Sequence, residues 1–165
     1  MSKKISRIDK YDASPDQILA MLQDPAYVEG KYQALGDVSS TVVEHTPGDG
    51  TLVLKMDRTV PADLPGFAKK VMGDTNQIVQ SENWTKTADG YTTDVHIEFP
   101  GKPLGITGKL EIKGTGEATS DWHVNMECKA SVPLIGGKLE GVLEKETLDS
   151  LDKEYAFNKE WLASH

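Results

Sequence analysis

The chain has 165 residues, enough for one domain with a hydrophobic core, and its 38% hydrophobic and 27% charged residues are typical of a soluble globular protein. It is acidic, with 26 Asp and Glu against 18 Lys and Arg and a formal net charge of −8. Lys and Arg never occur in a run longer than two. Because binding to a phosphate backbone needs a concentrated positive face, the composition argues against nucleic acid or an anionic membrane surface as a partner.

The single cysteine, Cys128, cannot form an internal disulfide, which is typical of a protein from a reducing compartment. The first residues carry charges but no apolar run behind them, so we expect no signal peptide. No segment approaches the roughly 20 apolar residues that a membrane-spanning helix needs, so we expect no stable membrane insertion. These features predict a cytoplasmic protein built as one domain over residues 1–165.

In chain order, residues 4–12 carry three apolar side chains among charges and are expected to form a first strand at a sheet edge. Residues 14–17, Ser-Pro-Asp-Gln, mark a helix start, with a capping serine, a proline at the first helical position and a glutamine that can complete a capping box. Asp24-Pro25 repeats this signal, and Gly36 ends the second helix. The sequence therefore predicts one strand followed by two short helices.

From Asp37 the apolar period changes to two, which predicts strands. The expected strands cover residues 38–46, 51–60, 77–86, 91–99, 106–113 and 120–132. In the last of them, alternate residues from Trp122 to Val132 are apolar and those between are polar, so one face is buried and the other faces water. Residues 64–72 interrupt the pattern and are expected to form a loop and a short helix.

A long helix is expected to follow Pro133 and to end near Trp161. One stripe at helical spacing is apolar at both ends but carries Glu146, Ser150 and Glu154 in its middle. A neighbouring stripe consists of Leu148, Leu151, Tyr155 and Leu162. Such a helix reaches roughly 40 Å at about 1.5 Å per residue, enough to cross a sheet. We therefore predict an α+β fold, in which a curved antiparallel sheet of about six to seven strands wraps around this helix.

The chain resembles the START-like superfamily, also called the helix-grip, birch-pollen-allergen-like or polyketide-cyclase-like fold. The resemblance rests on residues 13–19 (Ala-Ser-Pro-Asp-Gln-Ile-Leu), on the paired helices ending at Gly36, and on residues 132–140, which are similar to the ending of a bacterial branch of unknown function. The resemblance implies a hydrophobic small molecule, such as a lipid, quinone, sterol or polyketide, held between sheet and helix. Some members are cyclases or dehydratases and others are co-chaperones, and no general catalytic motif is carried over.

Polar residues on an inward strand face are informative, because a buried charge needs a partner or a shifted pKa. Arg58 is in phase with the apolar residues of its strand, and Glu82 is in phase with Trp84. As a pair, Arg58 and Glu82 would orient a carboxylate or carbonyl of the ligand. The alternative, which we favour, is that each lies near a strand end and reaches water.

Two further segments have alternative interpretations. Glu146, Ser150 and Glu154 either provide the polar end of a cavity or, as we favour, face solvent because the second helix stripe is the buried one. Residues 64–72 either pack as a simple connection or, as we favour, form a lid over the cavity. The candidate ligand-binding residues are Leu54, Met56, Arg58, Phe67, Met72, Glu82, Trp84, Trp122, Met126, Leu143, Glu146 and Ser150, of which the tryptophans and Met126 are equally suited to filling the core.

No cluster of His, Cys or carboxylate residues has ligand spacing, so we expect no metal site and no cofactor, and Cys128 is expected in the core. The lack of a paired acid, base or nucleophile favours a non-enzymatic binder or carrier of a hydrophobic small molecule. The first alternative is an enzyme of the cyclase or dehydratase type, with Arg58, Glu82 or Glu146 as acid, base or orienting group. The second is a co-chaperone-like interaction module, which requires an exposed apolar patch.

Overall fold

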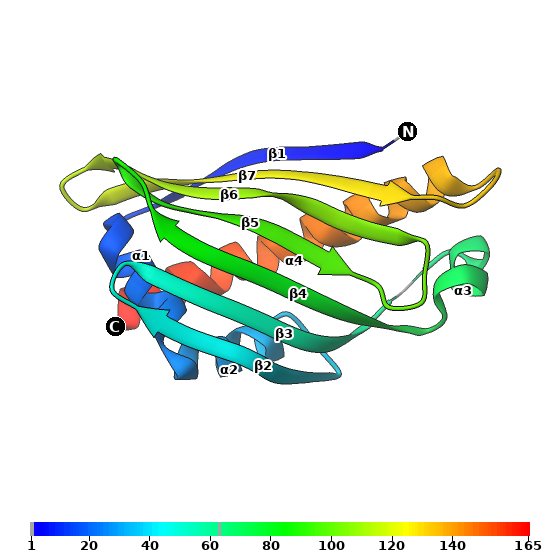
Figure 1. The fold of residues 1–165 in the computed structure, drawn as a ribbon, viewed down its shortest axis with the longest axis horizontal. Helices are drawn as coiled ribbons and strands as arrows, with labels where there is room; N and C mark the ends of the chain where they lie inside the picture. Colours follow the sequence, from blue (N-terminus) through cyan, green and yellow to red (C-terminus); the bar gives the residue numbers. More distant parts are fainter. Residues whose placement is uncertain (1, 63) are drawn as a thin grey trace.

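The computed structural model describes residues 2–62 and 64–165. Its strands are β1 (Lys3–Tyr11), β2 (Ser39–Gly48), β3 (Thr51–Pro61), β4 (Thr75–Lys86), β5 (Gly90–Glu98), β6 (Leu104–Gly116) and β7 (Thr119–Ala130). They form one antiparallel sheet in the order β1-β7-β6-β5-β4-β3-β2, so β1 lies at an edge, as predicted. The long helix α4 (Gly136–Ser164) runs lengthwise along one face of this sheet (Figure 1). The predicted α+β helix-grip architecture is confirmed.

Side chains alternate along each inner strand between the face that meets α4 and the face that meets solvent. In β3 the buried residues are Leu52, Leu54, Met56 and Arg58, and in β4 they include Ile78, Gln80, Glu82 and Trp84. Register shifts occur only in β2, between Val42 and Glu44, and near the end of β6, within the described ladders. Because β3 and β4 pair without a shift, the inward phase expected from their sequence is the one observed.

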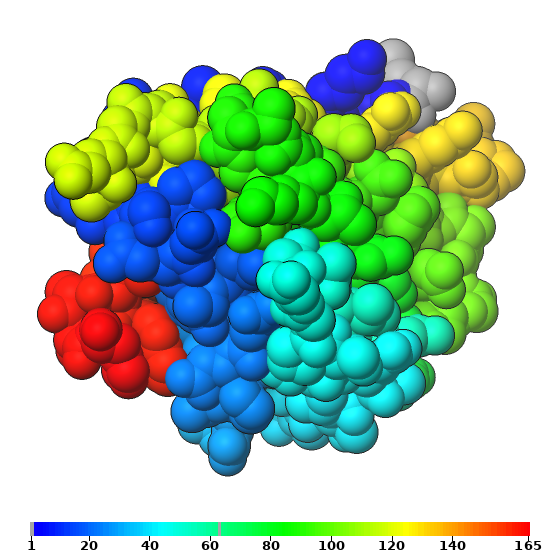
Figure 2. Space-filling model, turned by 60° about the vertical axis from the view of Figure 1, so that its left-hand side comes forward, coloured from blue at the N-terminus to red at the C-terminus, as the bar shows by residue number. Residues whose placement is uncertain are grey.

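The helices α1 (Pro15–Gln23) and α2 (Pro25–Ala34) follow β1 directly. The Ser14 hydroxyl accepts the amide N–H of Gln17 at 3.2 Å, and the Gln17 side chain accepts the amide N–H of Ser14 at 2.7 Å, which completes the predicted capping box. Gly36, just beyond α2, has φ +87°, a conformation that favours glycine. The two helices cover one end of the molecule, between the end of α4 and the β2–β3 turn (Figure 2).

The buried face of α4 consists of Leu139, Glu140, Leu143, Leu151 and Asn158. Leu148, from the stripe that we favoured as buried, is exposed, whereas Glu146, Ser150 and Glu154 are half-buried. The interpretation that these three polar residues face solvent is therefore wrong. The helix lies on the sheet along a line between the two predicted stripes, so each stripe is partly covered. None of the helices within the described residues is long and apolar enough to cross a membrane.

Candidate functional site

A cavity of about 360 Å³ lies between the sheet and α4. Its apolar wall is formed mainly by strand residues and by one side of α4, and includes Ile78, Ile97, Phe99, Ile106, Val142 and Leu143. The helix α3 (Gly66–Met72) and the connection before it add Leu64 and Met72. At the rim lie the exposed side chains of Lys145, Asp149 and Lys153, so the cavity opens to solvent beside α4. The arrangement is a mostly apolar chamber with a charged rim.

One end of the cavity is polar, because Arg58 and Asp37 both belong to its wall. Arg58 is only 6% exposed, and its Nε and Nη2 donate to the two carboxylate oxygens of Asp37 at 2.7 and 2.8 Å. The guanidinium carbon also lies 4.5 Å from the ring centroid of Tyr32. Burial lowers the pKa of Arg58, but the hydrogen bonds to Asp37 and the surrounding anionic groups outweigh it and raise the pKa. Arg58 is therefore a fixed, permanently charged donor at this end.

Behind Arg58 a chain of hydrogen bonds runs into the interior along β4. Arg58 Nη1 donates to Gln80 Oε1 at 2.9 Å, and Gln80 Nε2 donates to Glu82 Oε2 at 2.6 Å. The indole N–H of Trp84 donates to Glu82 Oε1 at 2.8 Å. Arg58 and Glu82 are thus both buried, and the interpretation that each reaches water at a strand end is wrong. They do not pair directly, because Gln80 lies between them.

A second buried polar group connects α2 with α4. Lys31 Nζ lies 2.7 Å from Glu154 Oε1 and is 5.3 Å from the ring centroid of Tyr32. Burial lowers the pKa of Lys31, but the charge of Glu154 and other neighbours outweighs it, and the pKa lies well above its usual 10.5. The Tyr32 hydroxyl is buried and has no hydrogen-bond partner among the described residues.

Four residues of these two polar groups were not among the candidates predicted from the sequence, namely Asp37, Gln80, Lys31 and Tyr32. The sequence does indicate that Lys31 is buried, because it lies one helical turn after Tyr27, on the apolar face of α2. A lysine on an apolar face implies a buried partner. Asp37 lies in the connection after α2, where an acidic residue is usually exposed to solvent. Its contact with Arg58 of β3 depends on the fold and has no signal in the sequence.

The structure places five of the twelve candidate residues in the cavity wall, namely Arg58, Met72, Leu143, Glu146 and Ser150. Six others are buried elsewhere between sheet and helices, namely Leu54, Met56, Glu82, Trp84, Trp122 and Met126. Within this group the rings of Trp84 and Trp122 meet edge to face with centroids 5.6 Å apart. Phe67 is half-buried on α3, with Lys138 Nζ 5.9 Å from its ring centroid. The lid function of residues 64–72 stays a prediction, although both ends of this segment reach the cavity.

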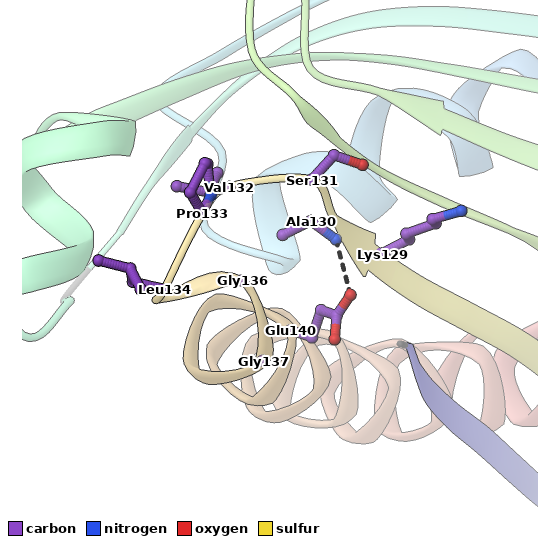
Figure 3. A pocket seen from close by; sticks show the side chains of 9 residues that line it. All are labelled: Lys129, Ala130, Ser131, Val132, Pro133, Leu134, Gly136, Gly137 and Glu140. Atoms are coloured by element: carbon purple, nitrogen blue, oxygen red, sulfur yellow. Dashed lines mark hydrogen bonds between the residues drawn. The ribbon is translucent and has the colours of Figure 1, made fainter.

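An open hollow of about 440 Å³ lies at the connection between β7 and α4. Figure 3 shows Glu140 directed from α4 toward β7, where its Oε2 accepts the amide N–H of Ala130 at 3.0 Å. This bond ties the start of α4 to the end of β7, although Glu140 Oε1 has no hydrogen-bond partner within residues 2–62 and 64–165. The wall of the hollow is mainly the connecting segment itself, and Leu134 there is fully exposed. The cavity between sheet and α4 is the better-enclosed candidate site.

Cys128 is fully buried on β7, and burial raises the pKa of its thiol to about 11, so it stays protonated and unreactive at neutral pH. In the described part of the chain no group of three or more His, Cys, Asp or Glu side chains is arranged to hold a metal ion.

A curved sheet around a long terminal helix, with paired short helices after the first strand, is the START-like fold. Protein TTHA0849 from Thermus thermophilus has this fold with a TM-score of 0.67 at 15% identity, covering 98% of both chains. A START superfamily protein from Mycobacterium smegmatis has a TM-score of 0.63 at 14% identity, over 96% of this chain and 98% of that one. The Zhui aromatase/cyclase from Streptomyces sp. R1128 has a TM-score of 0.59 at 11% identity, over 96% and 94%.

At these identities the likeness shows the fold alone. The chain belongs to the family described as "Protein of unknown function (DUF2505)", whose model matches residues 8–162. No curated protein matches the sequence.

Proposed function

We propose that this protein binds or carries a hydrophobic small molecule in the cavity between the sheet and α4. One observation carries the proposal: a mainly apolar chamber of about 360 Å³ ends at a buried, fixed and permanently charged hydrogen-bond donor, Arg58. This combination of apolar wall and few convergent polar groups is the usual composition of a small-molecule site. The cytoplasm stays the proposed compartment, since the lone Cys128 is suited to a reducing environment.

The candidates for acid–base chemistry support binding more than turnover. Glu82 does not belong to the cavity wall, and both of its oxygens accept hydrogen bonds from Gln80 and Trp84. Glu146 does belong to the wall, so a cyclase-type or dehydratase-type reaction would have to use it together with Arg58. A binder needs neither group to move a proton, and Arg58, with its raised pKa, is suited to orienting a ligand rather than to acid catalysis.

The proposal is tested with N-phenylnaphthylamine, an uncharged dye whose fluorescence rises in apolar surroundings. The variant Ser150→Phe places a large side chain into the cavity from α4, whereas Ala156→Phe makes a similar change at an exposed position of the same helix. We expect wild type and Ala156→Phe to bind the dye alike and Ser150→Phe to bind it at least about tenfold more weakly, a difference of about 1.4 kcal/mol. Equal binding by all three proteins would show that the dye does not occupy this cavity.

A further inference from the structure

The charges around the cavity bear on which hydrophobic molecule it accepts. The described wall contains three cationic side chains, Arg58, Lys145 and Lys153, and three anionic ones, Asp37, Glu146 and Asp149. Their formal charges cancel. At the rim, Lys145 Nζ lies 3.0 Å from Asp149 Oδ2, so one rim cation already has an acidic partner. The cavity therefore offers no excess positive charge to an anionic ligand.

The polar end is neutralised in the same way, and there the effect is strongest because the groups are buried. The Asp37 side chain is 3% exposed and the Arg58 side chain 8%, and two parallel hydrogen bonds hold them together. A ligand carboxylate near Arg58 would lose its hydration and would also meet the negative charge of Asp37 at close range. Both effects oppose its binding.

Arg58 nevertheless keeps donor capacity for an uncharged acceptor. A guanidinium has five N–H groups, and toward the described residues Arg58 uses three, two for Asp37 and one for Gln80. Two N–H groups remain on a side chain that belongs to the cavity wall. A carbonyl or ether oxygen can accept from them without adding a second negative charge beside Asp37.

We propose that the cavity selects an uncharged, compact apolar molecule with an acceptor oxygen placed at Arg58, and that Asp37 is the residue that excludes carboxylates. This inference rests on the proposed function and narrows its ligand class: ketones, quinones and esters are accepted, whereas fatty acids and other apolar carboxylates are disfavoured. The volume of about 360 Å³ lies near the lower end of the usual range for ligand sites, which favours a molecule of one or two rings over a long chain.

The test measures how well a matched pair of compounds displaces N-phenylnaphthylamine. Methyl naphthyl ketone and naphthoate share a ring system and a carbonyl oxygen but differ in charge, and ethylnaphthalene lacks the acceptor. We expect wild type to bind the ketone at least about tenfold more tightly than naphthoate. We also expect it to bind the ketone several-fold more tightly than ethylnaphthalene. In Asp37→Asn, which removes the charge but keeps an acceptor for Arg58, naphthoate affinity should rise about tenfold while ketone affinity changes little.

Wild-type protein that binds naphthoate as tightly as the ketone would overturn the inference and leave the cavity proposal intact. If Asp37→Asn kept the wild-type preference for the ketone over naphthoate, Asp37 would not be the residue that excludes carboxylates. If wild type bound neither the dye nor any of the three compounds, the proposed function itself would fail, and the ligand class with it.

Discussion

Two buried cations, Arg58 and Lys31, lie against the ring of Tyr32, and each has its own carboxylate partner, Asp37 or Glu154. Removing a charge of this kind from water is unfavourable by several kcal/mol, and the partner recovers that energy only while both charges are present. Each intact pair therefore adds little net stability, but each charge depends on its partner to remain buried. Substituting one partner of a pair should therefore lower the free energy of unfolding more than substituting both partners.

This dependence is testable at the pair between α2 and α4. Glu154→Gln leaves Lys31 buried without its counter-charge and should lower the free energy of unfolding by about 2–3 kcal/mol, below the full effect for a buried pair because Glu154 is 18% exposed. The double variant Lys31→Met with Glu154→Leu removes both charges and should come within about 1 kcal/mol of wild type. Urea denaturation measures all three proteins. A double variant that is destabilised as much as Glu154→Gln, or more, would contradict this mutual dependence.

Several buried groups hold protons that the unfolded chain releases at high pH. Burial raises the pKa of Cys128 from 9.0 to about 11 and that of Tyr27 well above 10.0, and the pKa of Lys31 is raised by Glu154. A group whose pKa is higher in the folded than in the unfolded protein stabilises the fold fully at pH values below its unfolded-state pKa. Its contribution to the free energy of unfolding decreases as the pH rises above that pKa. We expect a plateau near neutral pH and a decline from about pH 9, by about 1.4 kcal/mol per pH unit for each such group.

The control for this pH dependence is Cys128→Ala, which removes the group with the lowest unfolded-state pKa of the three. Its free energy of unfolding, measured by urea titration at a series of pH values, should stay level until about pH 10, where the tyrosines begin to contribute. An identical decline from about pH 9 in the variant would show that Cys128 is not its source.

At the scale of elements, the predictions that depend on nearby residues were confirmed. The capping box at Ser14, the stop at Gly36 and the alternation in β3 and β7 are local patterns, and each produced the expected element. Which side chains meet across the interior depends on register and on the line along which α4 crosses the sheet. For that reason the burial of Arg58 and its contact with Asp37 could not be derived from spacing alone.

The paired strands β6 and β7 approach each other closely at Gly108, which lies opposite Met126. A Cβ added to Gly108 would overlap the carbonyl oxygen of Asn125 and lie 2.8 Å from Cα of Met126, so the two strands would have to separate. Gly108→Ala should lower the free energy of unfolding by at least about 2 kcal/mol. The matched control on the same strand is Gly105→Ala, whose Cβ would lie 3.4 Å from the carbonyl oxygen of Ile97 and should have a small effect. Equal effects in urea denaturation would contradict the close approach.

For the whole molecule, α1 and α2 lie at one end of the space between sheet and α4 (Figure 1). The cavity is lined by Met72 of α3 and by residues of α4 between Val142 and Lys153. The buried hydrogen-bond chain from Arg58 to Trp84 occupies the interior behind the cavity. The described residues thus form a filled core and, beside it, a chamber that reaches solvent. A ligand that binds only the folded state should raise the free energy of unfolding, and with it the unfolding temperature, with the logarithm of ligand concentration over Kd.

Ligand binding between the sheet and α4 is tested most directly by native mass spectrometry of wild type and Ser150→Phe, each incubated with an organic-solvent extract of the cells that produce the protein. We expect one apolar, uncharged adduct per wild-type chain, released on denaturation, and no such adduct on Ser150→Phe. The absence of an adduct on wild type, or the same adduct on both proteins, would contradict ligand binding in this cavity.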